Sequence, residues 1–278
     1  MAQVSIITAS YNYQDYIKEA IESVIAQTFQ DWEMIIVDDG SSDNSLNVIK
    51  EYCLKDKRIK LYTHEGNINK GLPATIQLGL SKANSEWVAF LEADDIWENN
   101  YLEEKFNVVK EKPNVEFIYS DLEMFGDKEQ IEKNNRFFYN RLSSMAKSGN
   151  NEKDFSSLFV YRNWICTFSI VMCKKSLFVN CNFNSPLKAI VDYYLWTQLA
   201  QKCKFYYLDK KLTKWRIHKK SYIHNNKYSK GTEILFYRDI ANFTNANFKA
   251  KVRSLLLKFK LWRKTIVKQL VGKDPRIT

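Results

Sequence analysis

Short apolar runs alternate with segments of helical periodicity over the first 121 residues of the chain. The strand-like runs are apolar throughout, whereas a strand with one wet face would alternate apolar and polar residues. They therefore predict an α/β fold with a mostly parallel sheet that is covered by helices on both faces. The expected strands are 4–10, 33–40, 59–64, 87–95 and 115–121. Four helices are expected between these strands. The first begins after Asp15, the expected N-cap, and the second after residues 41–43, which can cap it; the others lie near 73–83 and 98–111.

The pattern loosens after residue 121. Residues 126–154 are polar and indicate a loop or excursion with a short helix. An apolar strand is expected at 168–173, followed by an aromatic-rich helix near 190–202 and a strand-like segment at 204–218.

Positive charge is concentrated late in the sequence. The chain carries +10 overall, and residues 249–278 hold ten Lys and Arg residues against one acid, so residues 1–248 are near neutral. Apolar residues recur there at helical spacing, which predicts a basic amphipathic helix. This helix could bind an anionic membrane surface or pack on protein, and both possibilities stay open. The apolar positions are Val252, Leu255, Leu256, Phe259, Trp262, Ile266 and Leu270.

Several classes of protein are disfavoured by what the sequence lacks. Its five cysteines include no C-x-x-C pair, which argues against a disulfide framework and a zinc site. No recognised nucleic-acid-binding fold accompanies the positive charge, so we expect no nucleic-acid partner. There is no signal-peptide pattern at the start and no run of the roughly 20 apolar residues that span a bilayer. We expect a cytoplasmic protein, peripheral at the inner membrane face if the basic tail binds lipid.

Polar side chains follow three of the predicted strands. Residues 10–12 follow the first, Asp38 and Asp39 end the second, and residues 92–95 end the fourth with three carboxylates. In open parallel sheets ligands bind beyond the carboxyl ends of the strands. If these strands are neighbours, their polar ends converge on one crevice.

The carboxylates of the fourth strand suggest a cation site. Along an extended strand Glu92 and Asp94 would share one side, with Asp95 on the other. Oxygen ligands spaced in this way suit Mg²⁺ or Mn²⁺, which keeps water and phosphate oxygens in its remaining positions. Alternatively, Asp94 and Asp95 only cap the following helix.

Six segments together resemble the conserved blocks of the family 2 glycosyltransferases with the GT-A fold, in the family's order over roughly residues 3–220. They are VSIITASYN, SVIAQTFQDWEMIIVDDGSSDNS, NKG, SEWVAFLEADDIW, VDYYLW and WRIH. The resemblance implies a GT-A, Rossmann-like sheet and transfer of a sugar from a nucleoside diphosphate, UDP being favoured, to an acceptor hydroxyl with inversion.

The resemblance also implies a nucleotide-binding set. Tyr11 matches an aromatic residue that packs on the nucleobase, and Asp39 a carboxylate that accepts an N–H of the base. Asp38 would shape the same wall. Lys70 can approach the donor, although an exposed solvated lysine is an equal alternative. Ala9, Ala93 and Arg216 complete the nucleotide-binding set.

A metal and a catalytic base follow from the same resemblance. Asp94 stands at the main position for Mn²⁺ or Mg²⁺, and Glu92 replaces the first Asp of the D-x-D block. His218 would be a further ligand or a hydrogen-bond partner of a phosphate. Asp192 matches the general base, and Val191 stands where the family often has Glu. Without the resemblance, Asp192 is only a carboxylate on an aromatic-rich helix, where a solvated or capping role is favoured.

Two further positions keep a structural alternative. Arg216 and His218 match an element near the diphosphate, but they could also end an ordinary surface strand. Asp121 could border the acceptor site, although a capping role is favoured there.

The expected organisation is a GT-A catalytic domain and an extension. Residues 1–225 would form the domain, with a nucleotide-sugar-binding half at 1–121 and an acceptor-binding half at 122–225, and residues 226–278 the helical C-terminal extension with its basic tail. The acceptor would be a glycan or a lipid-linked glycan of a surface polysaccharide, lipopolysaccharide or capsule. The alternatives are a catalytically silent sugar-nucleotide-binding or scaffold protein and a nucleotidyltransferase, whose usual glycine-rich loop after strand one is absent.

Overall fold

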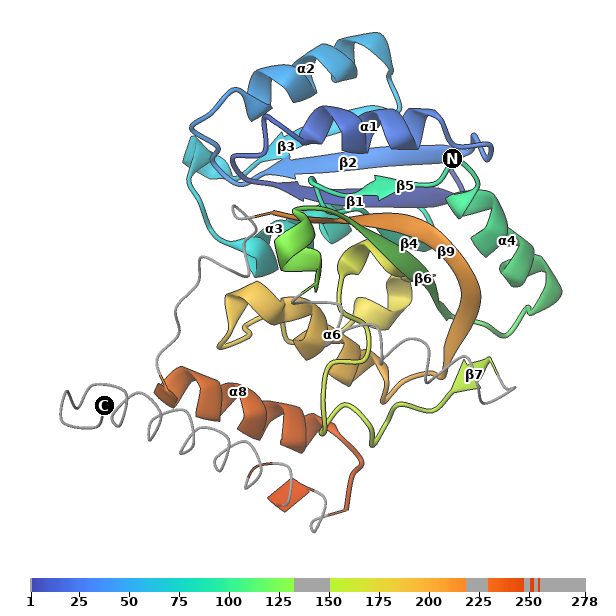
Figure 1. Cartoon of the computed structure of the whole chain (residues 1–278), viewed down its shortest axis with the longest axis vertical. Helices are drawn as coiled ribbons and strands as arrows, with labels where there is room; N and C mark the ends of the chain where they lie inside the picture. Colours follow the sequence, from blue (N-terminus) through green and yellow to red (C-terminus); the bar gives the residue numbers. More distant parts are fainter. Residues whose placement is uncertain (1, 133–150, 219–229, 248–250, 253–254, 256–278) are drawn as a thin grey trace.

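The computed structural model describes residues 2–132, 151–218, 230–247, 251–252 and 255. Within them, strands form one sheet in the order β3-β2-β1-β4-β8-β6-β9-β5, with β7 pairing to β9. Helices lie on both sides of the sheet (Figure 1). The α/β fold predicted from the sequence is confirmed. The strands are β1 (Val4–Ser10), β2 (Trp32–Asp38), β3 (Ile59–Thr63), β4 (Trp87–Phe90), β5 (Ile96–Trp97), β6 (Phe117–Gly126), β7 (Glu152–Lys153), β8 (Val171–Lys174) and β9 (Phe205–Ile217).

The first four strands form the parallel part of the sheet. β1 lies between β2 and β4, and β3 pairs with the outer side of β2. Helices or helical turns connect these strands, as the alternating pattern predicts. The α-helices are α1 (Ile17–Ile25), α2 (Ser45–Lys55), α3 (Leu72–Lys82), α4 (Tyr101–Glu111), α6 (Val191–Leu199) and α8 (Lys230–Phe243). The 3₁₀ turns are η1 (Glu65–Asn67), η2 (Phe168–Ile170), η3 (Lys175–Phe178) and η4 (Lys188–Ile190).

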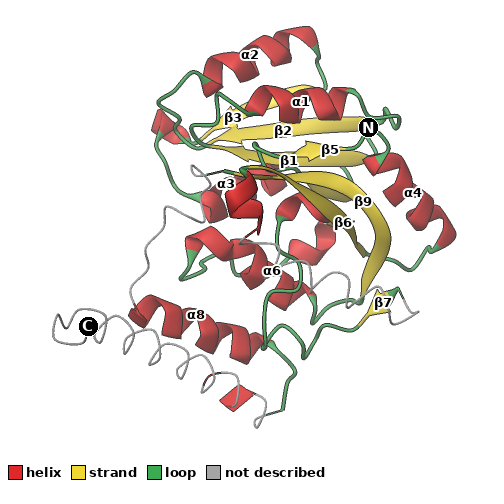
Figure 2. Cartoon of the chain, viewed as in Figure 1, coloured by secondary structure: helices red, strands yellow, loops and turns green. Residues whose placement is uncertain are grey.

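Antiparallel strands attach the second half of the chain. β8 pairs antiparallel with both β4 and β6, and β9 pairs parallel with β6 but antiparallel with β5 and β7. The sheet is therefore mixed, and it curls strongly along β6 and β9 (Figure 2). This curl brings the end of β9 beside the chain that follows β4.

Two hydrophobic cores lie on opposite faces of the sheet. Successive side chains of β1 point alternately into one core and the other, because side chains on a strand alternate in direction. Ile6 packs with α1 and α4, whereas Ile7 packs with α3 and α6. The continuous apolar runs of the sequence are thus explained by burial on both faces.

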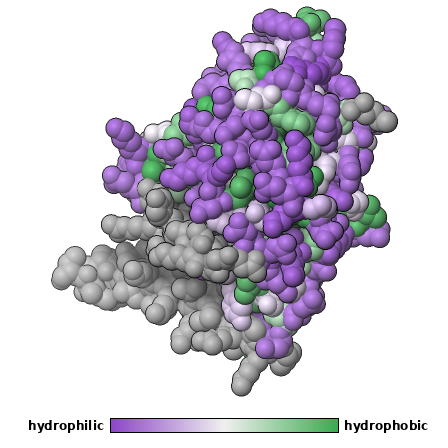
Figure 3. All heavy atoms as spheres, turned by 90° about the vertical axis from the view of Figure 1, so that its right-hand side faces the viewer, coloured by the Kyte–Doolittle hydropathy of each residue, from purple (hydrophilic) through white to green (hydrophobic). Residues whose placement is uncertain are grey.

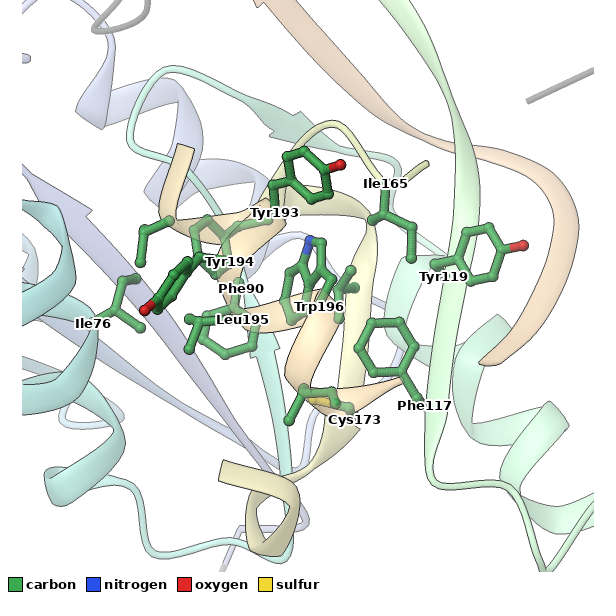
Figure 4. Packing of buried hydrophobic residues seen from close by; sticks show 14 of the residues in the cluster. Ile76, Phe90, Phe117, Tyr119, Ile165, Cys173, Tyr193, Tyr194, Leu195 and Trp196 are labelled. Atoms are coloured by element: carbon green, nitrogen blue, oxygen red, sulfur yellow. The ribbon is translucent and has the colours of Figure 1, made fainter. Parts of the chain in front are cut away.

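Helix α6 is almost completely buried. Trp196 packs against Phe90 of β4 and Phe117 of β6, at ring-centroid distances of 6.2 and 5.3 Å (Figure 4). Its other side meets α8, where Phe236 lies 5.5 Å from Tyr193. These contacts fix the helix against β4 and β6, and its first turn carries Asp192.

Some element boundaries differ from the predicted ones. α1 begins at Ile17 with Tyr16 at the N-cap position, so Asp15 does not cap it. β4 ends at Phe90 rather than at residue 95, and α4 begins only at Tyr101. The expected strand at 168–173 opens as η2 and becomes extended only in β8. Residues 133–150 of the expected excursion and most of the basic stripe lie outside the described residues. No helix within the described ranges is long and apolar enough to cross a bilayer.

Candidate active site

The three polar strand ends predicted from the sequence lie side by side. β1 stands between β2 and β4, so Ser10, Asp38 and the chain after Phe90 come out at the same edge of the sheet. This neighbour relation confirms that the polar strand ends converge at one edge of the sheet.

Residues 92–95 form a turn, which we call the acidic turn, rather than the end of a strand. The N–H of Asp95 donates to the Glu92 carbonyl at 3.1 Å. The prediction that Glu92 and Asp94 share one face of a strand is therefore wrong, because β4 has already ended. The helix-capping alternative is also wrong, since β5 intervenes and Asn100 occupies the N-cap position of α4.

Two hydroxyl groups, one within η2 and one at its N-cap, hydrogen-bond to two carboxylates of the acidic turn. Ser169 donates to Asp95 Oδ2 at 2.6 Å and accepts the N–H of Glu92 at 2.9 Å. Thr167 donates to Glu92 Oε2 at 2.5 Å. The backbone N–H of Arg216 adds a hydrogen bond to Asp95 Oδ1 at 2.9 Å. Asp95 thus serves a structural role, but toward η2 and β9 rather than toward the next helix.

Arg216 holds the acidic turn through its side chain as well. Its Nε donates to the Asp94 carbonyl at 2.8 Å, and its Nη2 pairs with Glu19 at 2.9 Å. The guanidinium also lies 5.0 Å from the ring of Tyr16 and 4.4 Å from that of Phe125. These contacts place Arg216 beside the acidic turn and give it a positioning role there.

His218 faces Asp94 directly. Its Nε2 lies 2.9 Å from Asp94 Oδ2, and its ring lies 4.6 Å from that of Tyr16. The Nδ1 atom is buried and meets no hydrogen-bond partner among the described residues. The surface-strand alternative is thus wrong for His218, because only 9% of the residue is exposed.

Burial and mutual repulsion disfavour ionisation of two carboxyl groups of the acidic turn. Burial, and then the charge of Asp94, raises the pKa of Glu92 to about 8. Burial and the charges of Asp94 and Glu92 raise the pKa of Asp95 well above its ordinary value. A cation would relieve this repulsion, since positive charge favours ionised carboxylates.

Few protein ligands are available for such a cation. Within the described part of the chain, no group of three His, Cys, Asp or Glu side chains could hold a metal ion. Asp94 and His218 offer an oxygen and a nitrogen 2.9 Å apart, whereas Glu92 Oε2 is engaged by Thr167. This donor set fits Mn²⁺ or Mg²⁺ that takes its other ligands from water and phosphate.

Asp39 clamps the loop that follows η1. Its Oδ1 accepts the N–H of Lys70 at 2.7 Å and its Oδ2 accepts the N–H of Gly71 at 2.9 Å. His64 Nε2 lies 3.4 Å from Oδ1. A Cβ on Gly40 would stand 2.8 Å from backbone atoms of the same loop. The clamp therefore fixes the loop beside the end of β2, where the nucleotide is expected.

The other residues expected on the nucleotide side lie in β1 and β2 or in the segments that follow β1, β3 and β4. Tyr11 is 41% exposed at the end of β1, so its ring is free to receive a flat ligand. Asp38 is buried and accepts hydrogen bonds from the backbone and hydroxyl of Ser41, which is a loop-holding role. The Lys70 side chain is exposed. Ala9 is partly buried within β1, and Ala93 is buried inside the acidic turn.

Asp192 lies in the first turn of α6 and is only 7% exposed. Its Oδ2 accepts a hydrogen bond from Asn163 Nδ2 at 3.0 Å. Burial is the largest cause that raises the pKa of Asp192 to about 6, and its charge is among those that raise the pKa of Glu92. The solvated alternative for Asp192 is therefore wrong, because the carboxylate is buried within electrostatic range of the acidic turn.

Sequence reasoning missed the residues that position these carboxylates. Asn163, Thr167 and Ser169 come from an irregular segment in which one amide and two hydroxyls form no recognisable motif. Asp121 lies elsewhere, at a β-bulge of β6, where its Oδ1 accepts the N–H of Leu122. Burial raises the pKa of its carboxyl.

Comparison with known proteins agrees with this geometry. The family model for glycosyl transferase family 2 matches residues 5–176, which is more than half of the chain. The chain belongs to this family. The matched residues include the acidic turn and the Asp39 clamp, and the match ends before α6 and β9.

Curated relatives share the sequence over part of their length. The glucosyltransferase WfgD of Escherichia coli, which transfers from UDP-Glc to a GlcNAc-diphosphoundecaprenol, is 38% identical over 47% of this chain and 49% of its own. TuaG of Bacillus subtilis, a putative teichuronic acid biosynthesis glycosyltransferase, is 39% identical over 39% of this chain and 42% of its own. An uncharacterized glycosyltransferase of Rickettsia bellii is 30% identical over 83% of this chain and 31% of its own. The chain thus spans about a third to a half of the length of these relatives.

Solved structures confirm the GT-A fold of this family 2 member. TarS residues 1–349 from S. aureus, in complex with UDP-GlcNAc, superimpose with a TM-score of 0.70 at 20% identity over 92% of this chain and 70% of that one. The mannosyltransferase PcManGT of Pyrobaculum calidifontis, in complex with GDP-Man and Mn²⁺, has a TM-score of 0.59 at 14% identity over 98% of this chain and 81% of that one.

Proposed function

We propose that this chain is an inverting glycosyltransferase that moves a sugar from a UDP-sugar to an acceptor hydroxyl. One observation carries the proposal: the carboxylate of Asp192 at the start of α6 is only 7% exposed, has its pKa raised to about 6 and acts electrostatically on Glu92 of the acidic turn. Family membership and the UDP-GlcNAc complex of a structural neighbour support the donor class.

In the proposed reaction Asp192 acts as the general base. As the acceptor oxygen bonds to the anomeric carbon, its proton passes to the carboxylate, and the bond from that carbon to the diphosphate oxygen breaks, releasing UDP. A base with a pKa near 6 is ionised at neutral pH and still basic enough to take the proton. General-base catalysis of this kind contributes about 10²- to 10⁴-fold.

The acidic turn is proposed to serve the leaving diphosphate. Asp94 and His218 would hold Mn²⁺ or Mg²⁺, with Glu92 as a further candidate ligand. When bound, the ion stabilises the charge that develops on the diphosphate. Arg216, Thr167 and Ser169 hold the turn in place for this role.

The Asp39 clamp is proposed to form the uracil pocket with Tyr11. Both oxygens of Asp39 already accept backbone N–H groups, yet each retains a second lone pair that can accept from a base. Ala9, Ala93, Asp38 and Lys70 complete the proposed nucleotide wall.

The acceptor is proposed to be a glycan or a lipid-linked glycan of a surface polysaccharide, lipopolysaccharide or capsule. The names of WfgD and TuaG support this class. We further propose a catalytic domain at 1–225, with a nucleotide-sugar half at 1–121 and an acceptor half at 122–225, and an extension at 226–278. Contacts between Phe236 of α8 and α6 show that the two regions touch.

The basic tail supports a peripheral position at the inner face of the membrane, because ten Lys and Arg residues between 249 and 278 would attract anionic lipid. The described atoms on the face in Figure 3 are mainly hydrophilic, with small separate hydrophobic spots. Deleting residues 249–278 should reduce sedimentation with phosphatidylserine vesicles while leaving UDP binding intact. Unchanged sedimentation would contradict the membrane role.

A panel of nucleotide sugars with Mn²⁺ tests the proposed chemistry. The native chain should release UDP from at least one UDP-sugar, and Asp192→Asn should abolish release with UDP affinity within about twofold of native. Asp239→Asn is the matched control, because Asp239 also contacts α6, through Tyr194 Oη at 3.3 Å, but lies on α8. Metal-dependent UDP binding without turnover across all donors and acceptors would favour a silent sugar-nucleotide-binding protein.

A further inference from the structure

The side chain of Asn163 links an irregular segment to the proposed base. Its Nδ2 donates to Asp192 Oδ2 at 3.0 Å, across 29 positions of sequence. We propose that Asn163 is a positioning residue that orients the Asp192 carboxylate toward the acceptor hydroxyl. This inference rests on the proposed function and deepens it.

The orientation of the Asn163 amide is determined by a second contact. Its Oδ1 accepts the N–H of Ile165 at 3.1 Å, and only the oxygen of the amide can accept a hydrogen bond. The NH₂ group must therefore face Asp192. Ile165 is completely buried in the core around α6, so the backbone that anchors the amide is itself fixed.

The contact restrains the carboxylate through one of its two oxygens. Oδ2 accepts the hydrogen bond from Asn163 at 3.0 Å. The backbone N–H groups of Asp192 and Tyr193 also act on the carboxylate from the helix start. The carboxylate is then already oriented when the acceptor hydroxyl binds, and this pre-orientation lowers the entropic cost of the reaction.

A neutral donor suits this position better than a charged one. Lys or Arg in place of Asn163 would stabilise the ionised carboxylate strongly and weaken it as a base. The amide of Asn163 restrains the Asp192 carboxylate and lowers its pKa less than Lys or Arg would. Asn163 is half-buried, which keeps the hydrogen bond from being replaced easily by water.

Asn182 provides a matched control, because it also lies outside α6 and donates to a side chain of that helix. It too uses Oδ1 to accept a backbone N–H two residues later, from Asn184, and Nδ2 to donate to an α6 side chain, Tyr194 Oη, at 3.2 Å. It differs in that its α6 partner is not the proposed base. Asn182→Ala should therefore leave kcat and the donor KM within about twofold of the native values.

Asn163→Ala should lower kcat by about 10- to 100-fold, the value of a hydrogen bond to a charged group. The donor KM and the Kd of UDP should stay within about twofold, because the nucleotide wall is untouched. If Asn163→Ala does not fold, Asn163→Ser replaces it, since a hydroxyl can still accept the Ile165 N–H but is too short to reach Asp192. A kcat like that of Asn182→Ala, or an equal loss of UDP affinity, would overturn the proposal.

A double-mutant cycle separates positioning from general loosening of α6. Asp192→Glu shifts the carboxylate away from Asn163, so adding Asn163→Ala to it should change kcat by less than about threefold. Full additivity of the two losses would overturn the positioning role. Turnover that survives in Asp192→Asn would instead refute the proposed base, so the two failures are distinguishable.

Discussion

Replacing Asp192 with Asn should inactivate the protein and at the same time stabilise it. The pKa of this buried carboxyl stands at about 6 against an ordinary value of 3.8. The folded chain therefore still binds a proton at pH values where the unfolded chain has released it. Once both states are deprotonated, the buried, ionised Asp192 lowers the free energy of unfolding by about 3 kcal/mol. Asparagine is nearly the same size, carries no charge, and can accept the hydrogen bond from Asn163 through its own oxygen.

The pH dependence gives this prediction its sign. Below about pH 4 the carboxyl is protonated in both states, so native and Asp192→Asn chains should be equally stable. Between about pH 4 and 6 the native chain loses stability relative to the variant as pH rises. Above about pH 6 the full difference of about 3 kcal/mol is reached, and it corresponds to roughly 2–4 °C in Tm for each kcal/mol.

Urea unfolding between pH 4 and pH 8, in EDTA to remove metal ions, measures the difference. Asp239→Asn, which removes a carboxylate beside Tyr194 instead, should change the free energy of unfolding little at any pH in this range. An Asp192→Asn chain that is less stable than native at pH 8, or whose advantage persists unchanged at pH 4, would refute the assignment of a buried, raised-pKa carboxylate. A catalytic group that costs stability is expected where a site is built for reaction rather than for folding.

Three further outcomes follow from the site. The value of kcat/KM should fall about tenfold per pH unit below about pH 6, as Asp192 takes up its proton, and a profile that is flat to pH 4.5 would contradict this. Ser169→Ala should lower the free energy of unfolding, measured by urea titration, by about 1–3 kcal/mol, because the buried Asp95 loses a hydrogen-bond donor. The same variant should bind UDP more weakly in the presence of Mn²⁺, as measured by calorimetry. Unchanged values in both measurements would show that Ser169 does not support the acidic turn. Gly40→Ala should destabilise the protein more than Gly66→Ala, since both have positive φ but only the first would place a Cβ 2.8 Å from backbone, and equal melting temperatures would contradict the clamp.

The parallel half of the fold was predictable because its physics is local. Burial on both faces forces continuous apolar runs, and the polar residues that interrupt them mark the strand ends. This is why β1, β2 and the convergence of the strand ends at one edge agree with the prediction. The same rule misplaced the end of β4, because Leu91 and Ala93 are both 1% exposed although neither lies in a strand. An apolar pattern reports burial and cannot distinguish a buried turn from an extended segment.

The supports of the catalytic carboxylates could not be predicted in this way. The contact from Ser169 to Asp95 joins residues 74 positions apart, and that from Thr167 to Glu92 joins residues 75 apart. Such pairs form only because β8 inserts antiparallel between β4 and β6, a topology that no local period encodes. Asp192 itself was found through its motif, whereas its burial and its partner Asn163 depend on the packing of α6.

The central claim is tested most directly by donor turnover in the native chain and in Asp192→Asn, with the same UDP-sugars, Mn²⁺ and acceptor glycans. We expect acceptor-dependent release of UDP and a new glycoside from the native chain. We expect UDP binding of nearly native affinity without product from the variant. Failure of the native chain to bind UDP, or equal turnover by both chains, would contradict the proposed function.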